Sequence, residues 1–157
     1  MAPISALAVA EFFIWKSHEV GDPITNLKLQ KLAYYAQAWH LTVHKTPLVS
    51  ERFEAWVHGP VCRELYAKYK VNGSLPIPNV SQKPALAPEV EQFLEEVFEV
   101  YGGFSAWDLE RLVHQERPWL AARTGLSADE AGTRPIDHSE IANYYGHLLV
   151  EAKPENS

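Results

Sequence analysis

The sequence predicts a mainly α fold, a compact single-domain bundle of about six helices with a small β element near residues 48–58. Apolar residues recur at helical spacing along most of the chain. One short segment, "RFEAWVH", instead alternates apolar and polar residues with period two, as half-buried strands do. The length of 157 residues, with 46% hydrophobic and 11% aromatic residues, favours one globular domain.

The first two helices follow each other closely. The first is expected over residues 4–19, because its apolar residues have helical spacing and Gly21 with Pro23 ends the pattern. Thr25 can cap the second helix through its hydroxyl, and Pro47 breaks the pattern after it. The second helix is apolar on most sides, so it is predicted to run through the centre of the fold.

The β element is predicted from the alternating segment and the turn after it. Two faces are expected: Phe53, Ala55 and Val57 on one, and Arg52, Glu54, Trp56 and His58 on the other. Gly59-Pro60 is predicted to turn the chain, with Pro60 at the first position of the next helix. That helix, "VCRELYAKYK", should end near Asn72-Gly73.

Residues 74–87 hold three prolines and are predicted to be an irregular loop. Pro88 then opens an amphipathic helix that stops at Gly102-Gly103, and Ser105 caps the helix that follows.

Three features organise the last part of the chain. Pro118 should end or reset the helix that contains it, with Trp119 as an anchor. A second loop is expected over residues 123–136, after which Asp137 caps the final helix. Residues 151–157 are expected to be a disordered tail.

Net charge and cysteine content limit the class of partner and the cellular compartment. The net charge of −6 and the lack of a basic patch argue against nucleic-acid binding. Cys62 is the only cysteine, which excludes an intrachain disulfide and favours a reducing compartment. The apolar N-terminus lacks a basic n-region and is interrupted by Glu11, and no uncharged apolar run reaches about 18 residues. We therefore expect a cytoplasmic protein that does not bind membranes.

Two residue pairs invite a chemical interpretation. His40 and His44 are four apart, as in a zinc helix, but Leu41 stands where a zinc protease carries its glutamate. Surface or capping histidines are the favoured interpretation. His58 and Cys62 could form a base and a nucleophile, but no third orienting group is evident, so a buried structural thiol is favoured.

Further catalytic patterns are missing. His114 and Glu116 are two residues apart on an expected helix, so they should point to different sides. Gly102-Gly103 is not followed by the lysine of a phosphate-binding loop, and there is no serine elbow. The sequence therefore predicts no catalytic residues, no metal ligands and no cofactor, and we do not expect an enzyme.

The second helix carries polar residues that can be interpreted in two ways. Gln30, Tyr34 and Gln37 have i, i+4 and i+7 spacing and so line one edge. In a structural interpretation, the two amides bond to backbone near the strand or its turn, because buried amides need partners. In a functional interpretation, they face a groove where a partner supplies those bonds. The tryptophans leave the same choice open, since tryptophan is common in cores and in interface hot spots.

Three segments together resemble the Panacea domain, a family long labelled as phage-associated proteins. They are "TNLKLQKLAYYAQAWHL", "PLVSERFEAWVHGPVCRELYAKY" and "YGGFSAWDLERLVHQERPWLAA". The resemblance spans roughly residues 4–150. Ala38, Cys62 and Arg63 are small departures from the family pattern. The matching positions that we assign to the structural motif are Lys28, Leu29, Gln30, Lys31, Leu32, Tyr35, Trp39, Gly59, Pro60 and Trp119.

The resemblance implies an antitoxin that neutralises a cognate toxin by direct binding. Panacea-domain proteins are encoded beside small toxic proteins, and their motif defines no catalytic residues. The residues that we expect to line a toxin-binding groove are Gln30, Tyr34, Gln37, Trp56 and His58. A homodimer is compatible with the sequence.

Three alternatives stay open. The protein could be an adaptor that delivers the toxin to an ATP-dependent protease. It could be an enzyme that reverses damage done by the toxin, although no catalytic constellation supports this. It could also be a phage accessory protein without a toxin partner.

Overall fold

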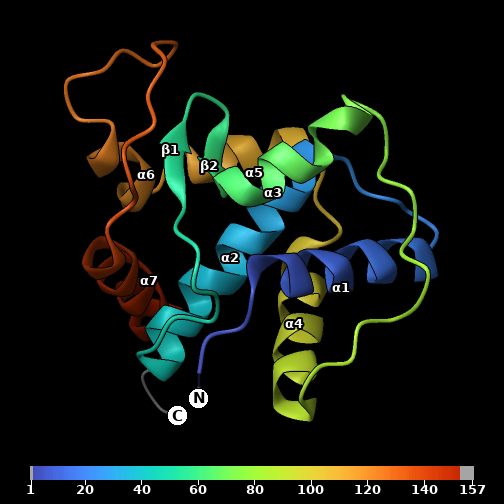
Figure 1. Ribbon diagram of the computed structural model, residues 1–157. Coiled ribbons are helices and arrows are strands. Elements are labelled where there is room, and N and C mark those ends of the chain that lie inside the picture. Colours follow the sequence, from blue (N-terminus) through green and yellow to red (C-terminus); the bar gives the residue numbers. More distant parts are fainter. Residues whose placement is uncertain (1, 153–157) are drawn as a thin grey trace.

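A computed structural model describes residues 2–152 and confirms a mainly helical fold (Figure 1). This part of the chain forms seven α-helices, one 3-10 helix and a two-stranded sheet. The elements are α1 (Ala6–Glu19), α2 (Asn26–His44), β1 (Glu54–Trp56), β2 (Gly59–Val61), α3 (Arg63–Tyr69), η1 (Lys70–Asn72), α4 (Pro88–Tyr101), α5 (Ala106–Val113), α6 (Arg117–Ala122) and α7 (His138–Ala152).

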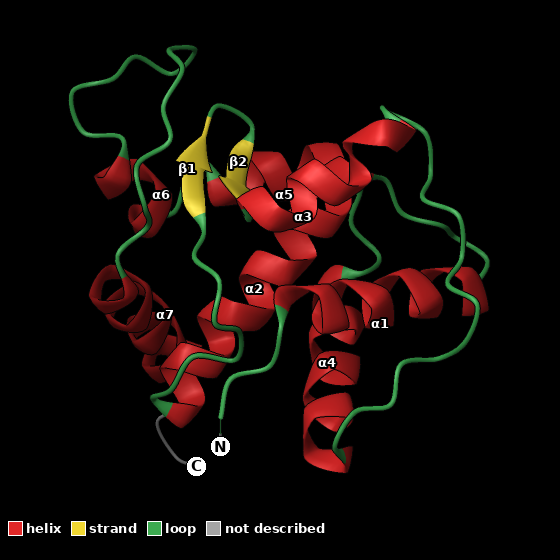
Figure 2. Ribbon diagram, in the orientation of Figure 1, coloured by secondary structure: helices red, strands yellow, loops and turns green. Residues whose placement is uncertain are grey.

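Helix α2 occupies the centre, as the sequence predicted. It contacts α1, α3, α4, α5, α7 and β2, and the other helices lie around it in Figure 2. Most of its side chains are buried because apolar residues lie on nearly every side of the helix. Thr25 caps it through a bond from the Lys28 N–H to Oγ1, 3.3 Å long.

Part of the alternating segment, Glu54–Trp56, forms strand β1, whereas Val57 and His58 lie in the turn that follows. Phe53 and Ala55 are buried, whereas Arg52 and His58 are exposed. Strand β1 pairs antiparallel with β2, with Trp56 opposite Gly59, so the turn lies at residues 57–58. The other edge of β1 is also covered, because the Ala55 N–H donates to the Arg134 carbonyl at 2.8 Å.

The predicted turn at Gly59-Pro60 is wrong, since both residues belong to β2 and the next helix begins at Arg63. Contacts from distant parts of the chain explain the difference. Gly59 has a φ of 122°, which disfavours any other residue, and an added Cβ would lie 3.3 Å from Val113 Cγ1. Close approach to α5, rather than a turn, therefore accounts for this glycine.

Element boundaries differ modestly elsewhere. Helix α2 ends at His44, three residues before the predicted break at Pro47. Pro118 does reset its helix, because it lies in the first turn of α6 after α5 has ended at Val113. The sequence places residues 151 and 152 in the tail, but they are the last two residues of α7, and the remaining expected tail, residues 153–157, lies outside the described residues.

A buried carboxyl group joins α2 to the C-terminal helices. Glu116 accepts hydrogen bonds from the hydroxyls of Tyr35 (2.7 Å) and Tyr145 (2.8 Å). Burial raises the pKa of the Glu116 carboxyl, while the two hydroxyls oppose this shift. His114 instead stacks on Trp119 with ring centroids 4.1 Å apart, so His114 and Glu116 contact different groups, as expected.

Candidate functional site

A groove of about 580 Å³ lies between the start of α2, the β1–β2 turn and α3. The 73–74 loop and the 131–133 loop complete its rim. Its lining includes Asn26, Leu27, Trp56, Val61, Arg63 and Tyr66. Leu27 and Tyr66 are exposed, at 41% and 39%, so the groove offers apolar surface to a partner.

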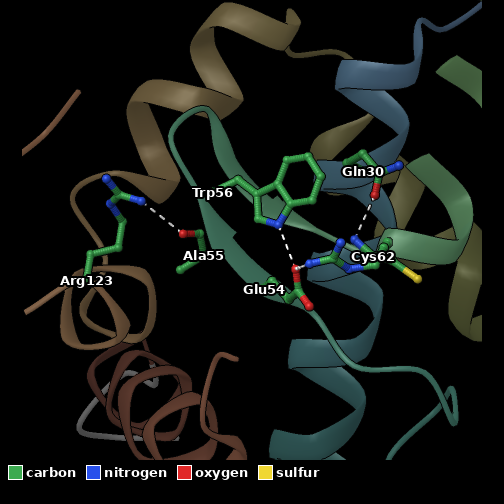
Figure 3. A network of polar contacts seen from close by, with 7 residues as sticks. Gln30, Glu54, Ala55, Trp56, Cys62 and Arg123 are labelled. Carbon is green, nitrogen blue, oxygen red and sulfur yellow. Dashed lines mark hydrogen bonds and ion pairs between the residues drawn. The ribbon is translucent and has the colours of Figure 1, made fainter. Parts of the chain in front are cut away.

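The Trp56 side chain is held in place at this groove (Figure 3). Its indole Nε1 donates to Glu54 Oε1 at 2.8 Å, and the same oxygen accepts from Arg63 Nη2 at 3.0 Å. The Arg63 guanidinium carbon lies 5.8 Å from the centre of the Trp56 ring. The Tyr66 ring packs against the Trp56 ring, with their centroids 5.0 Å apart. The aromatic wall is therefore ordered before any partner arrives.

Strand β1 is anchored from behind by the C-terminal half of the chain. Trp119 Nε1 donates to the Trp56 carbonyl at 2.8 Å. Arg123 Nη1 donates to the Ala55 carbonyl at 3.0 Å, as Figure 3 shows. These bonds satisfy one part-buried and one buried carbonyl of β1, and through the first of them Trp119 holds α6 against the strand.

Gln30 fits both the structural and the functional interpretation of the polar edge of α2, because it bonds within the fold and also borders the groove. It is 2% exposed, and its Oε1 accepts from the Cys62 N–H at 2.9 Å. Its Nε2 donates to Asn26 Oδ1 at 3.0 Å, while the residue also borders the groove. Gln30 thus joins α2 to the end of β2 and shapes the floor of the groove.

Tyr34 and Gln37 lie on the same helix edge but are sealed inside the chain. Their exposures are 0% and 1%. The Tyr34 hydroxyl bonds to that of Tyr145 at 3.2 Å. Gln37 bonds to the backbone of Leu48 and Val49. Of the five residues selected from the sequence, the structure therefore brings Gln30, Trp56 and His58 to the groove and keeps the other two away from it.

The reactive side chains near the groove are held in structural roles. His58 Nδ1 lies 3.2 Å from Glu110 Oε1, so its polar partner is this carboxylate and not Cys62. Cys62 is fully buried, which raises the pKa of its thiol to about 11. Lys31 is buried close to Gly59, and burial lowers the pKa of its amine to about 8.

His40 and His44 also lie close together, with ring centroids 4.6 Å apart. His40 Nδ1 is bonded to the Thr46 carbonyl at 2.6 Å, at the end of α2. Among residues 2–152, no group of three or more histidine, cysteine or acidic side chains is arranged to hold a metal ion.

The residues of the structural motif lie in the interior, except that Trp39 is half-buried. Lys28 shows how the motif supports the fold, because its Nζ donates to the Gly102 carbonyl at 2.7 Å and ties α2 to the end of α4. Trp39 Nε1 donates to the Tyr101 hydroxyl at 2.7 Å.

The sequence did not single out several groove residues. Arg63 and Tyr66 face the groove from the first two turns of α3. The amide of Asn26, next to the Thr25 cap, was a signal that could have been used. The 131–133 loop carries no such signal, because only long-range packing brings it beside β1.

The fold and the groove define a mainly helical domain with an ordered aromatic side chain at the edge of an open groove. Comparison with known proteins identifies its family. The family profile described as "Antitoxin SocA-like, Panacea domain" matches residues 29–120. The chain is 33% identical over 135 residues to Antitoxin SocA of Caulobacter vibrioides (strain NA1000 / CB15N), which covers 78% of this chain and 72% of that protein. No solved structure matches the chain. The chain belongs to the SocA-like antitoxin family with a Panacea domain.

Family membership supports an antitoxin role for this protein. Within residues 2–152, no helix is both long enough and apolar enough to cross a membrane.

Proposed function

We propose that this protein is the antitoxin of a toxin–antitoxin system and that it neutralises a cognate toxin by binding it directly in the groove beside Trp56. The family supports the antitoxin role. The position of the proposed binding site is supported by the ordered indole of Trp56 at the edge of an open groove. This indole donates a hydrogen bond to Glu54 and packs on Tyr66. The complex forms in the cytoplasm and involves no nucleic acid.

The energetics of such a complex are within reach of the groove. Nanomolar affinity corresponds to about 12 kcal/mol, and a few aromatic anchors commonly supply most of it. Trp56 meets the usual description of an anchor, because it is partly buried and its position is set before binding. Its rotamer entropy has already been lost on folding, so less free energy is spent on ordering when the toxin docks.

The experiment is co-expression with the toxin gene expected in the neighbouring reading frame, followed by a binding measurement on the purified pair. Trp56→Ala should abolish neutralisation and raise Kd about 30-fold or more, the effect of losing an anchor worth about 2 kcal/mol. Trp107→Ala is the matched control, because Trp107 is 66% exposed and does not line the groove. Leu27→Ala provides a second groove variant that leaves the Trp56 hydrogen bonds intact.

The proposal fails if Trp56→Ala and Leu27→Ala both neutralise the toxin with unchanged Kd. Repeating the test in cells that lack ATP-dependent proteases distinguishes direct masking from delivery to a protease. Under masking, the cells survive.

A further inference from the structure

No acidic side chain belongs to the lining of the groove, although the chain as a whole is acidic. The protein has a net charge of −6, with 20 acidic residues. The groove lining includes Arg63 and His58 but no aspartate or glutamate. Glu54 lies outside that lining, where its Oε1 is already occupied by Trp56 and Arg63. Both basic side chains of the lining already face a carboxylate just outside it: Arg63 Nη2 lies 3.0 Å from Glu54 Oε1, and His58 Nδ1 lies 3.2 Å from Glu110 Oε1.

A chain of hydrogen bonds also leaves one amide donor free at the groove. The Cys62 backbone N–H can only donate, so the Gln30 atom that it contacts at 2.9 Å must be the carbonyl oxygen. Gln30 Nε2 then donates to Asn26 at 3.0 Å, which makes the contacted Asn26 atom the carbonyl oxygen as well. The Asn26 NH2 is left over.

This NH2 group has no hydrogen-bond partner among residues 2–152. Asn26 is only 6% exposed, and it borders the groove. Among residues 2–152, the one fully buried side-chain nitrogen or oxygen without a partner is His114 Nε2, so the Asn26 nitrogen is accessible from outside the fold. Since Asn26 borders the groove, water or a ligand there can accept from its NH2 group.

We propose that the groove recognises a toxin segment in which a large apolar side chain stands next to an aspartate or glutamate. The apolar side chain packs on Trp56, and the carboxylate accepts from the Asn26 amide and the Arg63 guanidinium. Arg63 has five N–H donors, and its contact with Glu54 uses one nitrogen. A carboxylate fits better than a neutral carbonyl, because it accepts several bonds and those to charged donors are stronger. This inference rests on the proposed function.

The groove suits an internal segment rather than a chain end. Its rim includes the 73–74 loop and the 131–133 loop. In Figure 1, these loops lie on opposite sides of the β1–β2 pair, and both contribute residues to the lining of the groove. A segment that passes through can have chain on either side of the anchor.

The test uses a phage library of random 12-residue peptides, flanked by glycine-serine linkers so that no free carboxylate is presented, panned against the immobilised full chain. We expect the enriched sequences to share a large apolar residue beside Asp or Glu. A synthetic peptide of the enriched sequence should bind about tenfold or more weakly when its acid is replaced by the corresponding amide.

Two variants test the assigned contacts. Asn26→Asp removes the donor but keeps the oxygen that Gln30 contacts, and a carboxylate in the first turn of α2 favours the helix. Arg63→Gln removes the charge. Each should raise the Kd of the acidic peptide at least tenfold while leaving that of its amide counterpart unchanged. Arg111→Gln is the control, because Arg111 is exposed and outside the groove.

Four outcomes would overturn the inference. The enriched sequences could lack an acid, or the acidic peptide and its amide could bind with equal Kd. Binding could need a free C-terminus, or no enriched sequence could depend on Trp56. Failure of this inference alone looks different in cells. Trp56→Ala would then lose toxin neutralisation while Asn26→Asp and Arg63→Gln keep it. Intact neutralisation by Trp56→Ala would instead overturn the proposed function.

Discussion

Replacing Gln37 tests whether this amide serves the fold or the partner. In the structure, its Oε1 accepts from the backbone N–H groups of Leu48 (2.8 Å) and Val49 (3.0 Å), and its Nε2 donates to the Val49 carbonyl at 3.3 Å. Gln37→Met keeps the approximate shape but leaves these buried groups without partners. An unsatisfied buried polar group costs about 1–3 kcal/mol. Two donors at about 1.5 kcal/mol each suggest a loss of about 3 kcal/mol, before any contribution from the weaker third bond.

Urea denaturation followed by circular dichroism measures this loss directly. For a chain of 157 residues, about 3 kcal/mol should lower Tm by roughly 6–12 °C. Gln92→Met is the matched control, because Gln92 is an exposed amide on α4 whose bond to Glu96 lies at the surface. Its free energy of unfolding should change by no more than about 0.5 kcal/mol.

Toxin binding tests whether Gln37 also belongs to the interface. At a temperature where Gln37→Met is fully folded, it should bind the toxin with the Kd of the wild type, since the side chain is 1% exposed. An unchanged free energy of unfolding combined with lost binding would refute the reasoning and place Gln37 in the interface.

Three further predictions concern buried groups. Burial raises the pKa of Glu116, so the folded state holds the Glu116 proton more tightly than the unfolded state does. The free energy of unfolding should therefore fall as pH rises from the ordinary carboxyl pKa to the raised one. Urea titrations across that pH range should show this fall for the wild type and not for Glu116→Gln. Burial lowers the pKa of Lys31 to about 8, so above that pH the unfolded state binds more protons than the folded state. The wild type should therefore gain stability relative to Lys31→Met between about pH 8 and 10.4. A difference in free energy of unfolding that stays constant over this range would contradict the prediction. Gly59→Ala should cost about 2 kcal/mol because of the φ of 122° and the approach to Val113, whereas Gly103→Ala, with open space around its Cβ, is the control in the same thermal melt.

The groove residues show where prediction from sequence reached its limit. Gln30, Tyr34 and Gln37 share one edge of α2, and their spacing alone makes them equivalent. Helix α7 covers Tyr34 through Tyr145, and the segment at 48–49 covers Gln37, so only Gln30 reaches the groove. Helical spacing defines an edge, but it does not say which neighbours cover that edge.

The sequence by itself determined what depends on nearby residues. The caps at Thr25, Ser105 and Asp137 are bonds to backbone three residues ahead, so the pattern of residues is enough to predict them. The central place of α2 follows from its all-round apolar character, and the family resemblance from its ordered motifs.

Only the tertiary structure decided the role of Gly59 and the composition of the groove. Gly59 could be a turn or a strand residue until α5 approaches it, and the free donor of Asn26 exists because Cys62 orients Gln30 from a distant part of the chain. Such roles depend on contacts between segments far apart in sequence, whose packing energies no local pattern contains.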